Sequence, residues 1–321
     1  MENRQLGRTD IYVSPVALGC WPIAGMTSLH VTEANSLKTL QAAVDEGINH
    51  FDTAYAYGAA GESERLIAKG LGHRRDEIVI ATKGGIAWAA DGSRIVDGRP
   101  KTLRRQCEES LRRLETDRVE LLYLHAADPV TPIAESAGGL KQLLDEGKAR
   151  SICASNLSLG QLSEFSAECP LTAIQPNYNM LQRDIEAAIV PWCIENGVSI
   201  LVYWPLLKGL LAGKLARDHV FEEGDGRRKY SQFQGEQWRR NHDLLDELRP
   251  IAGQAERTLA QLVINWTIHQ PGITSALCGA KRPDQLRENA GGMGWQLADE
   301  LLAAIDRALA RRGKPAEMKA I

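Results

Sequence analysis

Four side chains that can transfer protons or hold charge follow three neighbouring strand-like segments of the sequence. Asp52 ends the second strand-like segment of the chain, and Tyr57 lies five residues further on. Lys83 immediately follows the third segment, and His125 ends the fourth. Each side chain alone has an ordinary structural explanation, as a helix cap, a packed aromatic, a loop charge or a core histidine. Together they place an acid, a base, a phenol and an imidazole within reach of one point, which favours an acid–base site.

The types of these side chains indicate how such a site would work. An isolated phenol titrates near pH ~10 and is a weak proton donor at neutral pH, whereas a neighbouring ammonium stabilises the phenolate. We therefore expect Lys83 to lower the pKa of Tyr57. A partly buried ammonium needs a counter-charge, which Asp52 is placed to supply, and His125 can orient a substrate oxygen by a hydrogen bond. The set is suited to protonating a developing alkoxide.

Eight short apolar segments alternate with stretches of helical periodicity along the chain. The predicted strands span residues 16–20, 48–52, 78–82, 119–125, 151–154, 172–175, 198–203 and 273–278. The predicted helices span residues 33–46, 62–71, 102–114, 133–146, 159–168, 184–196 and 255–269. Strands that are apolar throughout and separated by helices imply an α/β fold with a parallel sheet covered on both faces. Eight such units favour closure into a (β/α)8 TIM barrel.

A barrel brings the four side chains to one rim, because the functional groups of this fold lie where its strands end. An open doubly wound sheet is the alternative architecture. A dinucleotide-binding sheet of that kind would carry G-x-G-x-x-G after its first strand, and no such motif follows residues 16–20. We expect a single domain over residues 1–321, with a long loop after the seventh strand (206–249) and an extra C-terminal helix (298–311). The loop is long enough to be a lid.

The composition excludes several classes of protein. With 38 Lys and Arg against 41 Asp and Glu, the formal charge is -3 and the pI is about 6.2, so no nucleic-acid partner is expected. The longest low-polarity run, residues 16–26, is too short to cross a bilayer, so no membrane association is expected. The six cysteines form no C-x-x-C pair, and the seven histidines show no metal-ligand spacing. These patterns predict a cytoplasmic protein with free thiols and no metal site.

The segment around the first two candidate residues carries a family pattern. Residues 52–58 read Asp-Thr-Ala-Tyr-Ala-Tyr-Gly and are followed at 62–64 by Glu-Ser-Glu, which resembles the signature of the aldo-keto reductase superfamily. The resemblance extends over nearly the whole chain, through residues 81–83, 123–125, 154–158, 175–179, 203–206, 209–214 and 279–281. The chain is similar above all to bacterial NADPH-dependent oxidoreductases of the branch related to potassium-channel β subunits. This resemblance implies a (β/α)8 barrel that binds NADPH or NADP⁺ in extended form without a Rossmann domain.

The resemblance also implies a role for individual residues. Tyr57 would be the general acid, with Lys83 and Asp52 as its tuning pair. His125 would orient the carbonyl group of the substrate. The other implied contacts run along the cofactor from its nicotinamide to its adenine: Ser155, Asn156 and Gln175 at the carboxamide, Tyr203 stacked on the ring, Trp204, Leu206 and Lys214 at the pyrophosphate, and Gly279, Lys281, Gln285, Glu288 and Asn289 at the adenosine phosphate and adenine.

Two departures from the family pattern bear on substrate and cofactor. The better-known members have Trp and Pro after the catalytic His, whereas residues 126–129 read Ala-Ala-Asp-Pro here, so the substrate cannot be copied across. Some members have Lys at the position of Gly279 and Arg at that of Gln285. Recognition of a 2′-phosphate would therefore rest mainly on Lys281, with Arg282 as a further candidate.

The predicted activity is NADPH-dependent reduction of an aldehyde or ketone to an alcohol, and the reverse oxidation would use the same groups. The alternative is a cofactor-binding regulatory or partner protein that resembles a channel β subunit and has weak turnover. Trp21 and Trp88 follow the first and third strands. They are candidates for the wall of the substrate pocket or for covers of the barrel end. The sequence predicts neither the carbonyl substrate nor the oligomeric state.

Overall fold

The computed structural model describes residues 2–26 and 28–316, and its centre is a closed barrel of parallel strands. In chain order the barrel strands are β3 (Val16–Gly19), β4 (His50–Asp52), β5 (Val79–Gly84), β8 (Val119–Leu124), β9 (Ala149–Ser155), β10 (Ala173–Gln175), β11 (Ser199–Tyr203) and β12 (Ile273–Gly279). Neighbours in this order are paired, and β12 pairs with β3 to close the ring. The predicted (β/α)8 barrel is therefore confirmed.

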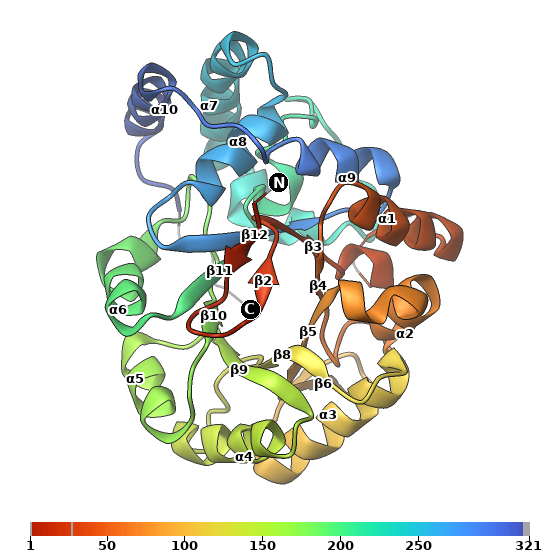
Figure 1. Cartoon of the computed structure of the whole chain (residues 1–321). Coiled ribbons are helices and arrows are strands. Elements are labelled where there is room, and N and C mark those ends of the chain that lie inside the picture. Colours follow the sequence, from red (N-terminus) through yellow and green to blue (C-terminus); the bar gives the residue numbers. More distant parts are fainter. Residues whose placement is uncertain (1, 27, 317–321) are drawn as a thin grey trace.

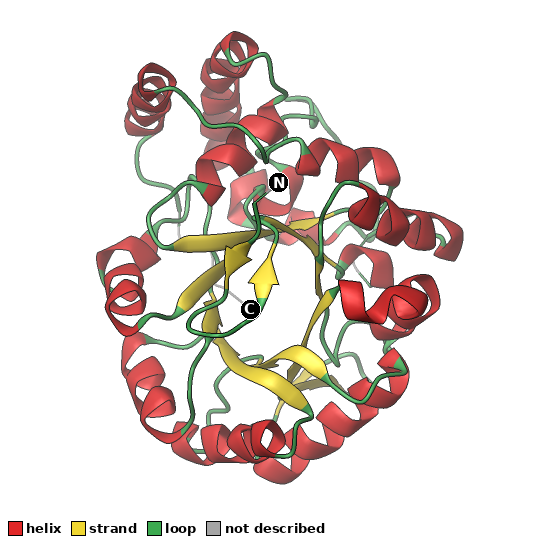
Figure 2. Cartoon of the chain, viewed as in Figure 1, coloured by secondary structure: helices red, strands yellow, loops and turns green. Residues whose placement is uncertain are grey.

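Helices surround the barrel on its outside, as Figures 1 and 2 show. In chain order they are α1 (Glu33–Asp45), α2 (Glu62–Leu71), α3 (Pro100–Leu114), α4 (Ile133–Asp145), α5 (Leu159–Glu168), α6 (Ile189–Asn196), α7 (Gly235–Gln254), α8 (Leu259–Ile268), α9 (Pro283–Ala290) and α10 (Asp299–Arg312). Local sequence explains several starts. Ser158 before α5 and Thr258 before α8 each accept a backbone N–H of the first turn, and a glutamine in that turn reciprocates.

The two faces of the barrel sheet bury different side chains, because successive residues of a strand point to opposite faces. Along β8, Leu122 and Leu124 belong to the cluster that packs against the helices. Leu121 and Tyr123 belong to the cluster that fills the barrel interior. The interior is thus a packed core rather than a pore.

A short hairpin closes the end of the barrel at which the strands begin. It consists of β1 (Arg4–Gln5) and β2 (Tyr12–Val13), and Figure 1 shows it in front of the barrel opening. Leu6, Ile11 and Val13 pack with the interior residues in one buried cluster. Apolar side chains seal this end, so access to the barrel is left to the end where the strands finish.

Two helices of the structure, α7 and α9, were not predicted from the sequence. α7 begins at Gly235, inside the predicted long loop 206–249, so the connection after β11 reaches only to residue 234. Leu248 is among the residues that dock this helix on the core, and such burial stabilises a helix more than local propensity does. α9 begins at Pro283, whose fixed φ suits the first position of a helix. The extra C-terminal helix is present as α10.

A further hairpin, between β5 and α3, was not predicted. β6 (Ile86–Trp88) and β7 (Arg94–Val96) pair in antiparallel fashion around a turn that contains Asp91 and Gly92. Asp-Gly is a strong hairpin signal in sequence, and Gly92 has φ +79, in the left-handed region that glycine favours. The signal was therefore present in the sequence.

Candidate active site

The ends of β4 and β5 bring Asp52 and Lys83 into a buried ion pair. Lys83 Nζ donates to Asp52 Oδ1 at 2.6 Å and to the backbone oxygen of Thr53 at 2.9 Å. It also donates to the hydroxyl of Tyr57 at 3.3 Å. From β10, Gln175 Nε2 donates to Asp52 Oδ2 at 2.7 Å. The two charged side chains are only 1% and 2% exposed, so this set of bonds holds both charges in fixed positions.

The loop that carries Tyr57 is held by a second buried set of polar side chains. Glu64, in the first turn of α2, accepts from Thr82 at 2.7 Å and from Arg113 at 3.1 Å. Arg113 also donates to the backbone oxygen of Tyr55 at 3.1 Å. The loop is therefore tied to β5 and α3, and the position of the Tyr57 hydroxyl does not depend on its single bond to the lysine.

The protonation of Tyr57 differs from the prediction made from sequence. Burial raises its pKa well above 10, and the charge of Asp52 raises it further. The expected lowering by Lys83 is wrong because Asp52 lies closer to the ammonium than the phenol does and compensates its charge. Tyr57 consequently holds its proton throughout the neutral range, as a proton donor must.

His125, at the end of β8, completes the cluster. Its ring centroid lies 6.0 Å from that of Tyr57, and its Nδ1 is buried without a hydrogen-bond partner among the described residues. Burial, Lys83 and Arg94 lower the pKa of His125 well below 6.5. The imidazole is therefore neutral, with one N–H that can donate to a carbonyl oxygen. The structure thus brings together all four side chains selected from the sequence.

Amide and hydroxyl groups form a second cluster on the same rim, at the ends of β9, β10 and β11. Asn156 Nδ2 donates to the backbone oxygen of His125 at 3.1 Å and to Ser155 Oγ at 3.0 Å. Asn156 Oδ1 accepts from the hydroxyl of Tyr203 at 2.8 Å. Asn156 has φ +58, a conformation that asparagine tolerates better than most residues. These bonds link the side chains of Ser155, Asn156 and Tyr203, and Ser155 Oγ donates to the backbone oxygen of Gln175 at 2.7 Å, so the four residues lie together.

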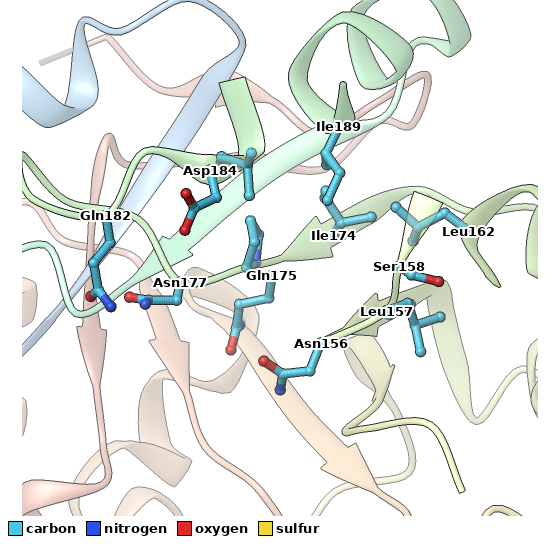
Figure 3. A pocket seen from close by; sticks show the side chains of 13 residues that line it. Asn156, Leu157, Ser158, Leu162, Ile174, Gln175, Asn177, Gln182, Asp184 and Ile189 are labelled. Atoms are coloured by element: carbon cyan, nitrogen blue, oxygen red, sulfur yellow. The ribbon is translucent and has the colours of Figure 1, made fainter. Parts of the chain in front are cut away.

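A cavity of about 340 Å³ borders this amide cluster and continues outward toward α5 and α6. Figure 3 shows Asn156 and Gln175 at its inner end and Ile189 at its far side. Apolar side chains such as Leu162 and Ile174 line its middle. Most of its apolar lining belongs to the cluster that packs between the barrel and the helices, so the cavity lies beside the amide cluster, on the helix-facing side of the sheet.

Cations gather beyond the amide cluster, along β11, β12 and α9. Lys214 forms an ion pair with Glu288, and Lys281 Nζ donates to the backbone oxygen of Leu29 at 2.7 Å. The pKa of Lys281 is lowered by burial and by two nearby guanidinium groups, Arg282 and Arg227. The two arginines are paired with carboxylates, Arg227 with Asp225 and Arg282 with Asp284, so the cations of this region already have acidic neighbours.

The other residues predicted at this end belong to the same assembly. Gln285 accepts from the backbone N–H of Lys281 at 3.0 Å, and Asn289 donates to the backbone oxygen of Gly279 at 3.3 Å. A Cβ on Gly279 would lie 2.8 Å from a side-chain carbon of Pro22. The position has no room for the lysine that some family members have there.

Aromatic side chains line the rim as expected. Trp21 packs edge-on against Tyr57 with ring centroids 4.9 Å apart, and Trp88 donates its indole N–H to the backbone oxygen of Ala56 at 2.8 Å. Trp204 packs edge-on against Tyr203 at 5.1 Å. Leu206, also predicted, packs against the hydrophobic core.

Sequence reasoning missed one cation of this rim. Lys208 Nζ lies 3.7 Å from the ring centroid of Trp204 and 4.4 Å from that of Tyr230, and it has no ion-pair partner among the described residues. Burial lowers its pKa to about 8. Lys208 lies one residue before the segment 209–214 that carries the family pattern, so proximity to that segment was the available signal.

No group of three or more His, Cys, Asp or Glu side chains in residues 2–26 and 28–316 could hold a metal ion. Over the same ranges, no helix has the length and apolar character needed to cross a membrane.

Comparison with known proteins gives consistent results. The model of the Aldo/keto reductase family matches residues 15–310. The chain is 35% identical over 310 residues to the aldo-keto reductase YhdN of Bacillus subtilis, covering 94% of this chain and 91% of that protein. It is 33% identical to the NADH-specific methylglyoxal reductase of Escherichia coli, covering 96% and 100%. The structure of the glycerol dehydrogenase AKR11B4 from Gluconobacter oxydans superposes with a TM-score of 0.91 at 34% identity, covering 99% and 98%.

Proposed function

The chain belongs to the aldo/keto reductase family of oxidoreductases, and from this premise we propose that it reduces an aldehyde or ketone with NADPH, with Tyr57 as the proton donor. The observation that carries the proposal is the contact of the Tyr57 hydroxyl with Lys83, whose ammonium forms a buried ion pair with Asp52. A protonated phenol at the end of the barrel, beside a neutral imidazole, is the arrangement that carbonyl protonation requires.

The hydroxyl and amide groups at the ends of β9, β10 and β11 fit the nicotinamide cofactor that the family uses. Ser155, Asn156 and Gln175 supply hydroxyl and amide groups to a carboxamide, and the Tyr203 ring offers a flat surface beside them. The cations beyond them match a diphosphate and an adenosine phosphate. The bound cofactor supplies the hydride for the carbonyl carbon.

The side chains of the cluster perform the remaining steps. His125 donates the one N–H of its neutral imidazole to the carbonyl oxygen and orients it, while Tyr57 is left as the group that gives up a proton. The Tyr57 hydroxyl gives its proton to that oxygen as the new C–H bond forms, leaving an alcohol and a phenolate. The ammonium of Lys83 stabilises the phenolate through their hydrogen bond until a proton from solvent restores the phenol.

NADPH rather than NADH is proposed because several cations converge on the adenosine end. The charges of Arg282 and Arg227 repel that of Lys281, although Asp284 and Asp225 pair with the two arginines. A 2′-phosphate placed among them would relieve that repulsion, whereas a ribose hydroxyl would not. The printed name of the E. coli relative describes it as NADH-specific, so the choice of cofactor has to be measured for this chain.

We also propose that the chain acts in the cytoplasm. All six cysteines are free and buried, which suits a reducing compartment.

The test is a turnover assay with the purified chain. Loss of NADPH absorbance is followed with a panel of aromatic, aliphatic and sugar-derived aldehydes, and the alcohol product is identified by mass spectrometry. We expect turnover of at least one carbonyl class, with kcat/KM higher for NADPH than for NADH. Binding of NADPH with no alcohol formed from any member of the panel would contradict the proposal and favour a partner or regulatory role.

A further inference from the structure

The β6–β7 hairpin presents one of its faces to the catalytic rim. Its register pairs Ile86 with Val96 and Trp88 with Arg94. Since side chains alternate between the faces of a strand, these four share one face and Ile95 lies on the other. We call this set of four side chains the inner hairpin face.

Packing shows where the inner hairpin face points. Ile86, Trp88 and Val96 form one apolar cluster with Ala56 and Ala126. These two alanines are the chain neighbours of the proposed proton donor and of the carbonyl-orienting histidine. The fourth member of the face, Arg94, therefore lies at the entrance to the catalytic cluster.

The guanidinium of Arg94 has no acidic partner among the described residues. The nearby carboxylates are already engaged. Asp91 accepts two hydrogen bonds within its own turn, Asp97 pairs with Arg99 at 2.5 Å, and Asp128 accepts from two backbone amides and a threonine hydroxyl. None of these carboxylates therefore forms an ion pair with Arg94, whose guanidinium is left exposed and able to bind a further anion.

That charge acts on the catalytic cluster. Arg94 is one of the groups that lower the pKa of His125, after burial and the charge of Lys83. It therefore lies within electrostatic range of the side chain that would hold the carbonyl oxygen.

We infer that Arg94 selects carbonyl compounds that carry a carboxylate at the end remote from the reacting carbonyl. This inference rests on the proposed function and specifies its substrate class. The planar guanidinium matches a carboxylate by two parallel hydrogen bonds, and a single cation matches its single charge. Trp88, fixed beside Arg94, provides an apolar wall for the carbon skeleton between the two groups.

A pair of probes that share one aldehyde and aromatic ring, and of which only one carries a carboxylate, tests the inference. We compare kcat/KM for 4-formylbenzoate and for its uncharged methyl ester. The unaltered chain is expected to prefer the carboxylate, and Arg94→Gln to reduce that preference about tenfold. Arg94→Lys should retain part of it, because the charge remains but the planar fork is lost.

Arg112→Gln is the matched control. Arg112 is an exposed arginine of α3 with no ion-pair partner among the described residues, and its replacement changes the net charge equally. The Arg112→Gln variant should prefer the carboxylate over the ester to the same degree as the unaltered chain. No preference for the carboxylate in the unaltered chain, or an equal loss in both variants, would overturn the inference.

The inference and the proposed function fail in different ways. Turnover of the ester without a carboxylate preference contradicts the inference alone. The proposed function fails only if no aldehyde of the wider panel is reduced, and in that case binding provides the readout for the inference. Calorimetry with NADP⁺ present then compares 4-(hydroxymethyl)benzoate with the corresponding benzamide. The anion site is supported if the unaltered chain binds the benzoate more tightly than the benzamide and Arg94→Gln abolishes this difference. Equal binding of the benzoate and the benzamide by the unaltered chain overturns it.

Discussion

The two lysine–carboxylate pairs at the ends of the proposed cofactor path differ in how they are held. Lys83 and Asp52 are almost fully buried, and three further hydrogen bonds fix them. Lys214 is 61% exposed and contacts Glu288 at the surface. A buried charge that loses its partner stays uncompensated, whereas an exposed one is solvated by water. The buried pair is therefore held permanently, and we expect Lys214 to exchange Glu288 for a cofactor phosphate.

The largest difference between the two pairs should appear in stability. Lys83→Met leaves Asp52 buried without its counter-charge and is expected to lower the free energy of unfolding by about 3 to 5 kcal/mol. Lys214→Met should change it by less than about 1 kcal/mol. Urea denaturation measures both. Similar losses for the two variants would remove the distinction, and the double variant Asp52→Asn/Lys83→Met should recover part of the loss.

The next effect concerns the proton donor within the buried cluster. Tyr57→Phe should lower kcat at least about 100-fold, because a positioned general acid contributes about that factor, while the dissociation constant of NADPH changes little. Tyr55→Phe is the control, since that hydroxyl bonds Glu109 at 3.1 Å outside the cluster. Steady-state kinetics and cofactor titration give the two quantities. Near-normal reduction by the Tyr57 variant would refute the assignment of the acid.

A smaller effect is expected at the cationic end. Lys281→Ala should weaken NADPH binding by about 1 to 3 kcal/mol, the range for loss of a charge-assisted hydrogen bond, with little effect on NADH. Lys214→Ala should weaken both cofactors to a similar degree, because both contain the diphosphate. Fluorescence titration distinguishes the two patterns. Equal losses for NADPH and NADH in the Lys281 variant would rule out its contact with a 2′-phosphate.

The last effect, which is small per pH unit, is a pH dependence of stability. His50 is buried in the barrel, and burial with the nearby Lys83 charge lowers its pKa to about 3. Below pH ~6.5 the unfolded chain binds a proton that the folded chain does not, so the free energy of unfolding falls as the pH falls toward 3. This group contributes a slope of up to about 1.4 kcal/mol per pH unit. His50→Gln should reduce the slope, and replacement of the exposed His73 serves as the control.

The buried cluster was the more predictable of the two regions. Asp52 and Lys83 lie at the ends of adjacent strands, and strand ends of a parallel barrel meet on one rim whatever the loops do. The burial that raises the pKa of Tyr57 depends on side chains from distant segments, such as Trp21, and no local pattern reports it. A prediction of the Tyr57 pKa from the charge of Lys83 alone therefore gave a shift of the wrong sign.

The loops were less predictable for a related reason. Lys208 faces two aromatic rings because residues 204 and 207–208 adopt left-handed backbone conformations, which tertiary contacts impose. The β6–β7 hairpin did carry a local signal in its Asp-Gly turn. Its position over the rim follows from packing of Val96 on Ala56 and Ala126, which a sequence pattern does not contain.

The most direct test of the central claim follows the hydride and the proton donor together. NADPH carrying deuterium at both C4 positions is mixed with excess enzyme and an aldehyde that the turnover panel identifies. The account predicts that the alcohol gains one deuterium at carbon in a single turnover, and that Tyr57→Phe, saturated with the same cofactor, forms it at least about 100-fold more slowly. An alcohol without deuterium, or equal rates for the two proteins, would contradict it.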